Sequence, residues 1–406
     1  VASGVGAAVA LAPRVVSPSF QEATSVDPLA HGARGDGRTD DLEAINRALA
    51  IAASAGLPLD GGNRVYAVSG NLSLTRASRP WIRSLRLKQL DPVSGRRTLF
   101  LNQCEAIRVD SLQIDVGSNK RAGDMNSTAG LWIEGGANHN VRNVEVFGHG
   151  KNSLIAVWRT RNSIFNALTV RDAQFDDPDA HDDVMQGIWL SANADLVLRN
   201  ARVANLTGNA SYVGQRLANL RTRGITLGGN ARVSIVNAQV TNVDQGIDLT
   251  GSEGNRDCSV LGGRTHDCGS VGVKLANSAV RCRVEGHVAE QAGMYAFLAS
   301  GPAETSLPFK TQDCDFIRCT AIDAGYNRIS YPNPSGFQVR MGDYDRHLPS
   351  GIRFIGCRAI DRQVVQTMKY GFYSDVGPQL PGYSPNLLID CTSKGHSDAE
   401  RFGIWQ

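Results

Sequence analysis

The residue types best suited to chemistry gather in one stretch of the chain, between positions 221 and 274. Carboxylates in such a cluster act as general acids or bases, histidine exchanges a proton near neutral pH, and lysine or arginine stabilises a developing negative charge. Asp248 and Lys274 occupy the same position in two consecutive copies of a short repeat, so we expect their side chains to meet. The other candidate catalytic residues around this pair are Asp244, His266, Asp267 and Arg223.

Asp248 should hold Lys274 in its charged form, because a neighbouring carboxylate favours the ammonium ion. A charged lysine is a weak base, but it stabilises a substrate carboxylate or a developing enolate. For a reaction that removes a proton from the substrate, we therefore expect His266 or an arginine at 221–223 to accept that proton. The alternative is a plain exposed salt bridge between Asp248 and Lys274, which contributes under about 1 kcal/mol.

Aromatic and polar residues occupy the matching position in other copies of the repeat, on both sides of this charged centre. Aromatic side chains offer a large flat apolar face, on which a sugar ring can stack. The other interpretation is that loops cover these aromatic residues as a small satellite core. The predicted substrate-binding residues are Trp132, Trp189, Thr226, Phe297, Tyr373 and Arg221.

An acidic run between Phe175 and Asp183 leads into the strand expected around Trp189. Carboxylate oxygens are the ligands that Ca²⁺ prefers in proteins. A solvated acidic loop is the alternative interpretation, and no cofactor other than a possible calcium ion is expected. The candidate ligands of that ion are Asp179, Asp182 and Asp183.

A short phrase of glycine, apolar, variable and apolar residues recurs along most of the chain. The copies at Gly224, Gly246 and Gly272 are 22 and 26 residues apart. Side chains alternate between the two faces of a strand, so the apolar pair would face a core and the variable residue would point outward. The spacing fits one coil of three short strands and predicts a solenoid of stacked coils, with an ordinary β-sandwich as the alternative. The other copies begin at Gly130, Gly187, Gly336 and Gly371, with weaker ones at Ile155 and Ala296.

Two further residue types recur at fixed places in the coil. Asparagines follow alternating strands, and we expect them to form a buried ladder in which each side-chain amide bonds to the next coil. Cysteines recur at 319, 357 and 391, where we expect an interior column of small thiols rather than disulfides. The asparagines of the expected ladder are Asn143, Asn166, Asn200 and Asn237.

The amino-terminal part differs in composition from the repetitive region. Residues 1–26 are small and apolar at first and are typical of the remnant of a signal peptide or another leader. Residues 27–80 are interpreted as a cap, in which Asp40 begins a helix over 40–53 and forms a capping box with Glu43. Residues 81–406 then form the solenoid, whose open end that helix would cover.

The segment from His31 to Ile45 reads His-Gly-Ala-Arg-Gly-Asp-Gly-Arg-Thr-Asp-Asp-Leu-Glu-Ala-Ile. It resembles the opening of the pectate-lyase-like superfamily, which includes pectate lyases, polygalacturonases and phage tailspikes. The resemblance implies an all-β chain, a right-handed parallel β-helix with an amino-terminal capping helix, and a polysaccharide as the partner. It also implies a monomer or a homotrimer outside the cytoplasm, in the periplasm or secreted.

A second segment, Asn242 to Leu249, resembles the Asn-Thr-Asp-Gly-Ile-Asp strand of the polygalacturonase-type hydrolases, with one extra residue. Asp267 and Cys268 resemble half of the Gly-Asp-Asp-Cys motif of those enzymes, but His266 replaces the other aspartate. The Gly-His-Gly and Arg-Ile-Lys motifs of that family are missing at the corresponding coils. The resemblance therefore extends to Asp244 and Asp267 only as a possible acid and base.

Composition excludes two classes of protein. The chain has 42 Lys and Arg against 39 Asp and Glu, a formal charge of +3, whereas nucleic-acid-binding domains are usually strongly basic. No apolar run reaches the roughly 18 residues of a membrane span. We therefore expect neither a nucleic-acid partner nor a membrane span.

The favoured function is a lyase that cleaves an acidic, uronic-acid-containing polysaccharide by β-elimination. That reaction needs a cation to neutralise the uronate carboxylate and a base to remove the α-proton. Arg223, Lys274 and His266 supply such groups in adjacent coils.

The first alternative is a glycoside hydrolase of the polygalacturonase type, which needs two carboxylates flanking the glycosidic bond. Asp248 could supply one of them, with Asp244, Asp267 or Asp183 as the second. The second alternative is a non-catalytic, adhesin-like protein that only binds a glycan, and the third is an epimerase.

Overall fold

The structure is a computed structural model, and all structural statements refer to one set of residues. These are 25–90, 97–117, 129–150, 152–174, 185–208, 222–251, 253–301, 310–326, 333–341, 348–376, 384–398, 400 and 402.

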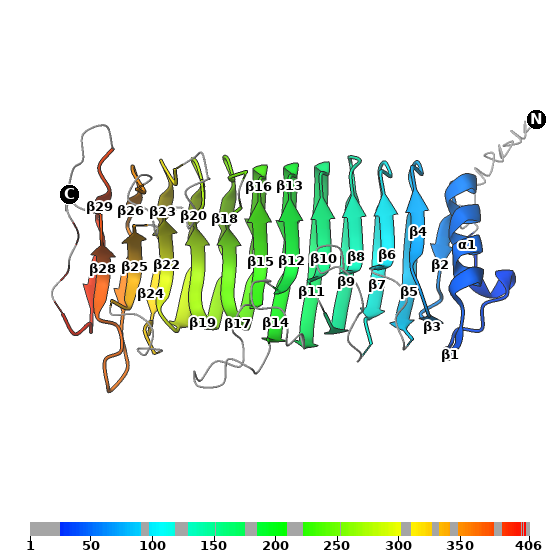
Figure 1. Ribbon diagram of the computed structural model, residues 1–406, viewed down its shortest axis with the longest axis horizontal. Helices are drawn as coiled ribbons and strands as arrows, with labels where there is room; N and C mark the ends of the chain where they lie inside the picture. Colours follow the sequence, from blue (N-terminus) through cyan, green and yellow to red (C-terminus); the bar gives the residue numbers. More distant parts are fainter. Residues whose placement is uncertain are drawn as a thin grey trace, which may run out of the picture.

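The strands pair in parallel with the equivalent strands of the coils before and after, so the chain forms one long solenoid with the amino-terminal helix at one end (Figure 1). Three stacks of strands, named sheets A, B and C, run along its length. Sheet A consists of β4 (Leu72–Thr75), β6 (Arg97–Asn102), β8 (Ala129–Glu134), β10 (Ser153–Trp158), β12 (Met185–Ser191), β15 (Thr222–Gly228), the second halves of β17 (Gln239–Leu249) and β19 (Arg264–Leu275), β22 (Tyr295–Ser300), β25 (Ser335–Arg340) and β28 (Tyr370–Ser374).

Sheet B consists of β2 (Pro58–Asp60), the first halves of β5 (Trp81–Gln89), β7 (Arg108–Asp115), β9 (Asn140–His149) and β11 (Arg161–Gln174), then β13 (Ala194–Arg199), β16 (Ala231–Val236), β18 (Ser259–Leu261), β20 (Arg283–Glu285), β23 (Asp315–Ile317), β26 (Arg353–Ile355) and β29 (Leu387–Ile389). Sheet C consists of β1 (Asp36–Asp40), β3 (Val65–Val68), the second halves of β5, β7, β9 and β11, then β14 (Arg202–Thr207), the first halves of β17 and β19, β21 (Val288–Ala292), β24 (Thr320–Ile322), β27 (Arg358–Ile360) and β30 (Thr392–Lys394).

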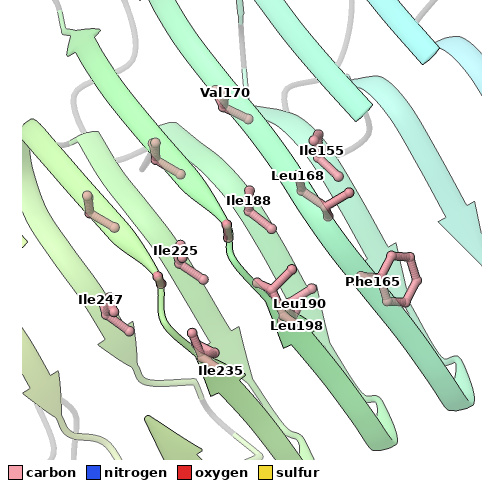
Figure 2. Close-up of a cluster of buried hydrophobic side chains, with 14 of the residues drawn as sticks. Ile155, Phe165, Leu168, Val170, Ile188, Leu190, Leu198, Ile225, Ile235 and Ile247 are labelled. Atoms are coloured by element: carbon pink, nitrogen blue, oxygen red, sulfur yellow. The ribbon is translucent and has the colours of Figure 1, made fainter. Parts of the chain in front are cut away.

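The core lies inside the three sheets and repeats from coil to coil. Ile155, Ile188, Ile225 and Ile247 follow one another on consecutive coils of sheet A and are essentially inaccessible to water (Figure 2). These are the first apolar residues of the recurring phrase, so its predicted inward direction is confirmed.

Toward the carboxyl end, the same interior position holds aromatic rings. Phe297, Phe337 and Phe372 stack with ring centroids 4.8 Å apart, and Phe297 is fully buried. The assignment of Phe297 to the outward, substrate-binding position is therefore wrong. Ala296 replaces the glycine of the phrase in this coil, so Phe297 is the first apolar residue and Leu298 is the outward one.

The capping helix is present as α1 (Leu42–Ala55), preceded by a short 3₁₀ turn, η1 (Pro28–His31). Its N-cap is Asp41 and not Asp40 as expected, and the Asp41 carboxylate accepts hydrogen bonds from the backbone of Arg34 and Gly35 at 2.6 and 3.0 Å. The buried face of the helix covers the end of the solenoid, as predicted. Its buried residues are Ala44, Ile45, Ala48, Leu49 and Ala52.

A buried asparagine ladder exists, but at a different corner of the coil from the one expected. The predicted ladder residues Asn143, Asn200 and Asn237 are exposed, and they adopt left-handed backbone conformations with φ between 53° and 55°. Asparagine is one of the few side chains that tolerate this conformation, which explains its recurrence there. Asn166, one residue before the corner, accepts a hydrogen bond from Asn200 at 2.9 Å but is only half-buried.

The actual ladder consists of Asn193, Asn230 and Asn255 at the corner that follows sheet A. Each is at most 1% exposed, and the side-chain oxygen of one accepts from the backbone N–H of the preceding one at 3.0–3.2 Å. The side-chain amides also donate to backbone carbonyls, such as that of Val157.

The expected thiol column is confirmed. Cys319, Cys357 and Cys391 lie in register on consecutive coils, and all the cysteines of the described residues are unpaired by disulfides. Cys391 is half-buried and the others are buried. In the described part of the chain, no helix has the length and hydropathy that a membrane crossing requires.

Candidate active site on sheet A

The variable residues of the phrase form one outward column along sheet A, as predicted, and strand pairing fixes their register. Adjacent members are one coil apart, about 4.8 Å. From the amino-terminal side the column reads Phe100, Trp132, Ala156, Trp189, Thr226, Asp248, Lys274, Leu298, Gln338 and Tyr373.

Asp248 lies at the centre of this column, between two cations. Oδ2 of Asp248 is 3.1 Å from Nη1 of Arg223 and 3.9 Å from Nζ of Lys274. The carboxylate is completely buried, whereas the side chains of Arg223 and Lys274 each retain 19% exposure. The predicted contact between Asp248 and Lys274 is thus present. Arg223, on the preceding coil, makes a second contact with the Asp248 carboxylate.

Several buried polar atoms around this triad have no hydrogen-bond partner among the described residues. They include both carboxylate oxygens of Asp248, Oγ1 of Thr226 and the side-chain oxygens of Gln186 and Gln245. Gln186, Arg223 and Gln245 are in register on β12, β15 and β17, beside the column that holds Thr226 and Asp248. Leaving a buried polar group unpaired costs about 1–3 kcal/mol, and such groups in native proteins often mark functional sites.

Burial lowers the pKa of Lys274 from its ordinary value, because the charged ammonium loses its hydration. Asp248 acts in the opposite direction, while Arg223 adds to the lowering of the pKa. Desolvation therefore outweighs the attraction of the carboxylate in setting the pKa of Lys274, and the expected charged form of Lys274 stays a prediction. A lysine with a lowered pKa is a better candidate for a base than a fully charged one.

Lys274 also lines a cleft of about 170 Å³ on the outer face of sheet A. Arg340 also lines this cleft and contributes to lowering the pKa of Lys274, so the two side chains share one space. The floor is apolar, formed by Val271 and Leu298. Arg340 belongs to β25 and was not predicted as a site residue, because it follows the recurring phrase instead of occupying its variable position.

Of the remaining predicted catalytic residues, only Asp244 lies near the triad. It is 5% exposed, and its charge raises the pKa of Lys274. His266 belongs to the sheet C half of β19, in register with Thr241, whose hydroxyl is 3.5 Å from Nδ1 of His266. This contact of the His266 ring thus lies on sheet C, away from the Asp248 carboxylate.

Asp267 is exposed at the turn between sheets C and A, in a left-handed conformation with φ of 52°. The hydroxyl of Tyr326 lies beside it and donates to the carbonyl of Cys268 at 3.2 Å. Burial, and then the charge of Asp267, raise the pKa of Tyr326. Asp267 and Asp248 are therefore placed on different elements, Asp267 at a bend of β19 and Asp248 on β17, beneath the outer face of sheet A.

The predicted aromatic residues divide into three groups. Trp132 is only 1% exposed and packs beneath Trp158 and Trp189, so it is a support for other rings rather than an open sugar platform. Trp189 is half-buried and lies in the column as expected. Tyr373 also lies in the column, stacked on Tyr370 at 4.7 Å, but three coils beyond Lys274.

Four predicted residues fall outside the described residues. They are Arg221, proposed to bind substrate, and the candidate calcium ligands Asp179, Asp182 and Asp183. Within the described ranges, no group of three or more His, Cys, Asp or Glu side chains is placed to hold a metal ion. Most residues of the loops 171–183 and 201–223, whose length predicts that they wall the groove, also lie outside those ranges.

The parallel coils and the outward column define a right-handed parallel β-helix. The family described as "Right handed beta helix region" matches residues 97–262. A search of curated protein sequences found no match.

Solved structures with the same fold are similar to the chain over most of its length. The A-module of mannuronan C-5 epimerase AlgE6 from Azotobacter vinelandii is 16% identical, with a TM-score of 0.62, over 93% of this chain and 96% of that one. The A-module of AlgE4 from the same organism is 14% identical, with a TM-score of 0.55, over 94% and 99% of the two chains. The pre-mature gene product 12 of bacteriophage phi29 is 13% identical, with a TM-score of 0.56, over 90% and 52%.

Proposed function

We propose that the protein is a polysaccharide lyase that cleaves an acidic, uronic-acid-containing polysaccharide by β-elimination. The observation that supports this proposal is the buried Asp248 carboxylate, which holds two cations together, one of which faces the cleft beside Arg340. A uronate sugar brings a carboxylate into such a site, and the guanidinium groups of Arg223 and Arg340 can neutralise it.

In this reaction Lys274 takes the proton from C5 of the uronate ring. The C–H electrons form the C4–C5 double bond, and the bond from C4 to the glycosidic oxygen breaks with its electron pair on oxygen. That oxygen then takes a proton from the Lys274 ammonium or from water. Arg340 and Arg223 stabilise the charge that develops on the uronate carboxylate, which is the usual role of a preorganised cation.

A glycoside hydrolase fits these residues less well. Its two carboxylates must reach opposite sides of the glycosidic bond. Asp248 is completely buried and engaged by Arg223 and Lys274, so it serves as a positioning residue and does not touch the substrate. Asp244 is 5% exposed, which leaves little surface for contact with a sugar.

A uronate C5 epimerase is the second candidate, because it begins with the same proton removal. Two of the structurally similar proteins are described as mannuronan C-5 epimerases. The lyase and the epimerase differ only in the second step, which is bond cleavage in one and return of a proton to the opposite face of C5 in the other. Residues that remove the proton are shared by both proposals.

The deciding experiment incubates the full chain with polygalacturonate, mannuronan, guluronan and a glycosaminoglycan panel. A lyase generates an unsaturated product that absorbs in the ultraviolet, whereas a hydrolase generates only new reducing ends. An epimerase changes the proton NMR spectrum of the polymer without shortening it. Parallel reactions with a chelator test the proposed calcium requirement. Reducing ends without ultraviolet absorbance would contradict the lyase proposal.

We also propose that the protein works outside the cytoplasm, because a long polysaccharide is an extracellular substrate. We further propose that it is a monomer or a homotrimer. Fractionation of the source cells and light scattering of the purified chain test these two points. A cytoplasmic location would contradict the first.

A further inference from the structure

A second cleft lies on the same outer face, toward the amino-terminal side of the triad. Its volume is about 330 Å³, and it crosses four consecutive coils where sheet A ends. Its walls include Trp158 and Arg159 from β10, Trp189 from β12 and Glu253, which follows β17. None of the proposed catalytic steps uses this cleft.

Two tryptophan rings form one side of the cleft. The rings of Trp158 and Trp189 are stacked, with centroids 6.5 Å apart and planes inclined by 27°. Trp132 packs edge-on beneath both, at 6.2 and 5.7 Å, and its indole N–H donates to Glu134 at 3.2 Å. The two upper rings are half-buried, so each keeps part of its surface open to solvent.

The other side of the cleft is kept open by glycines. Gly251 has a φ of 134°, and a Cβ atom there would lie 2.8 Å from the Cα of Gly228. A side chain at Gly251 would therefore be strained and would clash with backbone. The absence of side chains at Gly228 and Gly251 leaves room opposite the tryptophan rings for a flat ligand.

The charged groups of this cleft balance each other. The guanidinium of Arg159 lies over the Trp158 ring at 4.1 Å from its centroid, and Glu253 lies beside Gly229. One positive and one negative side chain offer hydrogen bonds to hydroxyl groups but no net attraction for a carboxylate. The catalytic cleft differs, because Arg340 lines it and Arg223 lies near Lys274, so positive charge is in excess there.

Strand register sets the separation between the two clefts. Trp189 pairs with Thr226, Thr226 pairs with Asp248, and Asp248 pairs with Lys274, so three coils separate the ring from the proposed base. Three coils span about 14.4 Å, and one pyranose ring is roughly as long as one coil spacing of about 4.8 Å. A glycan that follows the column would place its third sugar from the reacting unit over the tryptophans.

We infer that this aromatic cleft binds an uncharged pyranose ring, three sugar residues from the reacting uronate. The inference deepens the proposed function and rests on it only for the position of the reacting unit. The sugar ring packs against the solvent-exposed surface of Trp158 and Trp189, while Arg159 and Glu253 bond to its hydroxyl groups. The substrate is then a polysaccharide that carries neutral sugars beside its uronates.

Binding is tested separately from cleavage, by isothermal titration calorimetry with neutral hexasaccharides of β-linked glucose, mannose and xylose. The full-length protein is compared with Trp158→Ala, which removes the ring, and Trp158→Phe, which retains an aromatic face. Trp81→Ala is the matched control, because Trp81 lies on sheet B and does not line this cleft. Melting temperatures of all variants check the fold.

We expect at least one hexasaccharide to bind, with affinity about tenfold weaker in Trp158→Ala and retained in Trp158→Phe and Trp81→Ala. No binding by the unmodified protein, or equal binding by Trp158→Ala, would overturn the inference. The cleavage assay on acidic polysaccharides tests the proposed function separately. If acidic polymers are not cleaved while Trp158→Ala still loses hexasaccharide binding, the lyase proposal fails and the aromatic cleft stands.

Discussion

At the scale of single residues, the members of the triad of Arg223, Asp248 and Lys274 have two different roles, positioning and contact with the substrate. The buried carboxylate fixes two cations in place, and the lysine reaches the cleft where a substrate can lie. The register of the repeat predicted the meeting of Asp248 and Lys274, because both occupy its variable position. The sequence did not predict the protonation behaviour of Lys274, because that depends on how neighbouring coils remove water from an outward-pointing side chain.

Replacement of Lys274 tests its role as the base. In Lys274→Ala and Lys274→Arg, we expect turnover of the acidic polysaccharide to fall by roughly 10²–10⁴-fold, since arginine keeps the charge but cannot give up its proton. In the unmodified protein, the rate should rise with pH as Lys274 deprotonates, with a midpoint below the ordinary lysine pKa because burial lowers it. Initial rates across pH measure both effects, and a full rate in Lys274→Arg would rule out a base at this position.

Asp248→Asn tests the positioning role of the carboxylate. The Asp248 charge raises the pKa of Lys274, so its removal should lower that pKa further and move the rising limb of the pH profile to lower pH. Two cations also lose a buried partner, which should reduce the free energy of unfolding by about 3 kcal/mol at neutral pH.

The control for this variant is Asp257→Asn, which breaks an exposed pair with Arg281 whose atoms are 2.7 Å apart. We expect a cost under about 1 kcal/mol there. Urea denaturation and the pH profile are the measurements. A pH profile that does not move in Asp248→Asn would show that the carboxylate does not act on Lys274.

At the scale of strands and corners, the recurring phrase identified sheet A and most of its register. It failed at Phe297, because alanine replaces the marker glycine in that coil and the outward position falls one residue later, at Leu298. It also could not show that Trp132 is covered, since Trp158 and Trp189 pack over it from neighbouring coils. Trp158 follows the phrase by one residue, and a search for aromatic residues just beyond each copy would have found it.

The asparagines show a second limit of pattern analysis. The chain has asparagine at two kinds of corner, and recurrence alone does not distinguish tolerance of a left-handed backbone from burial in a hydrogen-bonded ladder. Only the stacking of coils places Asn193, Asn230 and Asn255 inside and leaves Asn237 in solvent.

Asn230→Leu should therefore reduce the free energy of unfolding by about 1–3 kcal/mol, because it leaves buried partners of Asn230 unpaired. Those partners include the backbone N–H of Asn193 and the carbonyl of Leu190, at 3.0 and 2.9 Å. The matched control is Asn237→Gly, where glycine suits the φ of 53°. Urea unfolding midpoints compare the two, and equal midpoints would contradict the buried ladder.

At the scale of the whole molecule, each coil contacts mainly its two neighbours. The coils at the two ends lack one neighbour, so the cover over these ends determines whether solenoids associate with one another. An open end of three parallel sheets presents unpaired backbone groups and apolar side chains to other chains. The amino-terminal end is closed by α1, which was predictable from its helical periodicity and from the resemblance carried by residues 31–45 (Figure 1). The covering contact itself depends on side chains such as Ile45, which is 0% exposed.

The role of this cap is tested with two substitutions on the same helix. Ile45→Asp places a carboxylate in the apolar contact between α1 and the first coil, which should release the helix and expose the ends of the sheets. Ile51→Asp makes the same chemical change at a side chain that is 42% exposed, so it should leave the cap in place. We expect Ile45→Asp to aggregate or elute as larger species in size-exclusion chromatography with light scattering, and to melt at a lower temperature. If Ile45→Asp stays monodisperse and melts at the same temperature as Ile51→Asp, the proposed role of α1 is contradicted. The end of the solenoid would then need no cover.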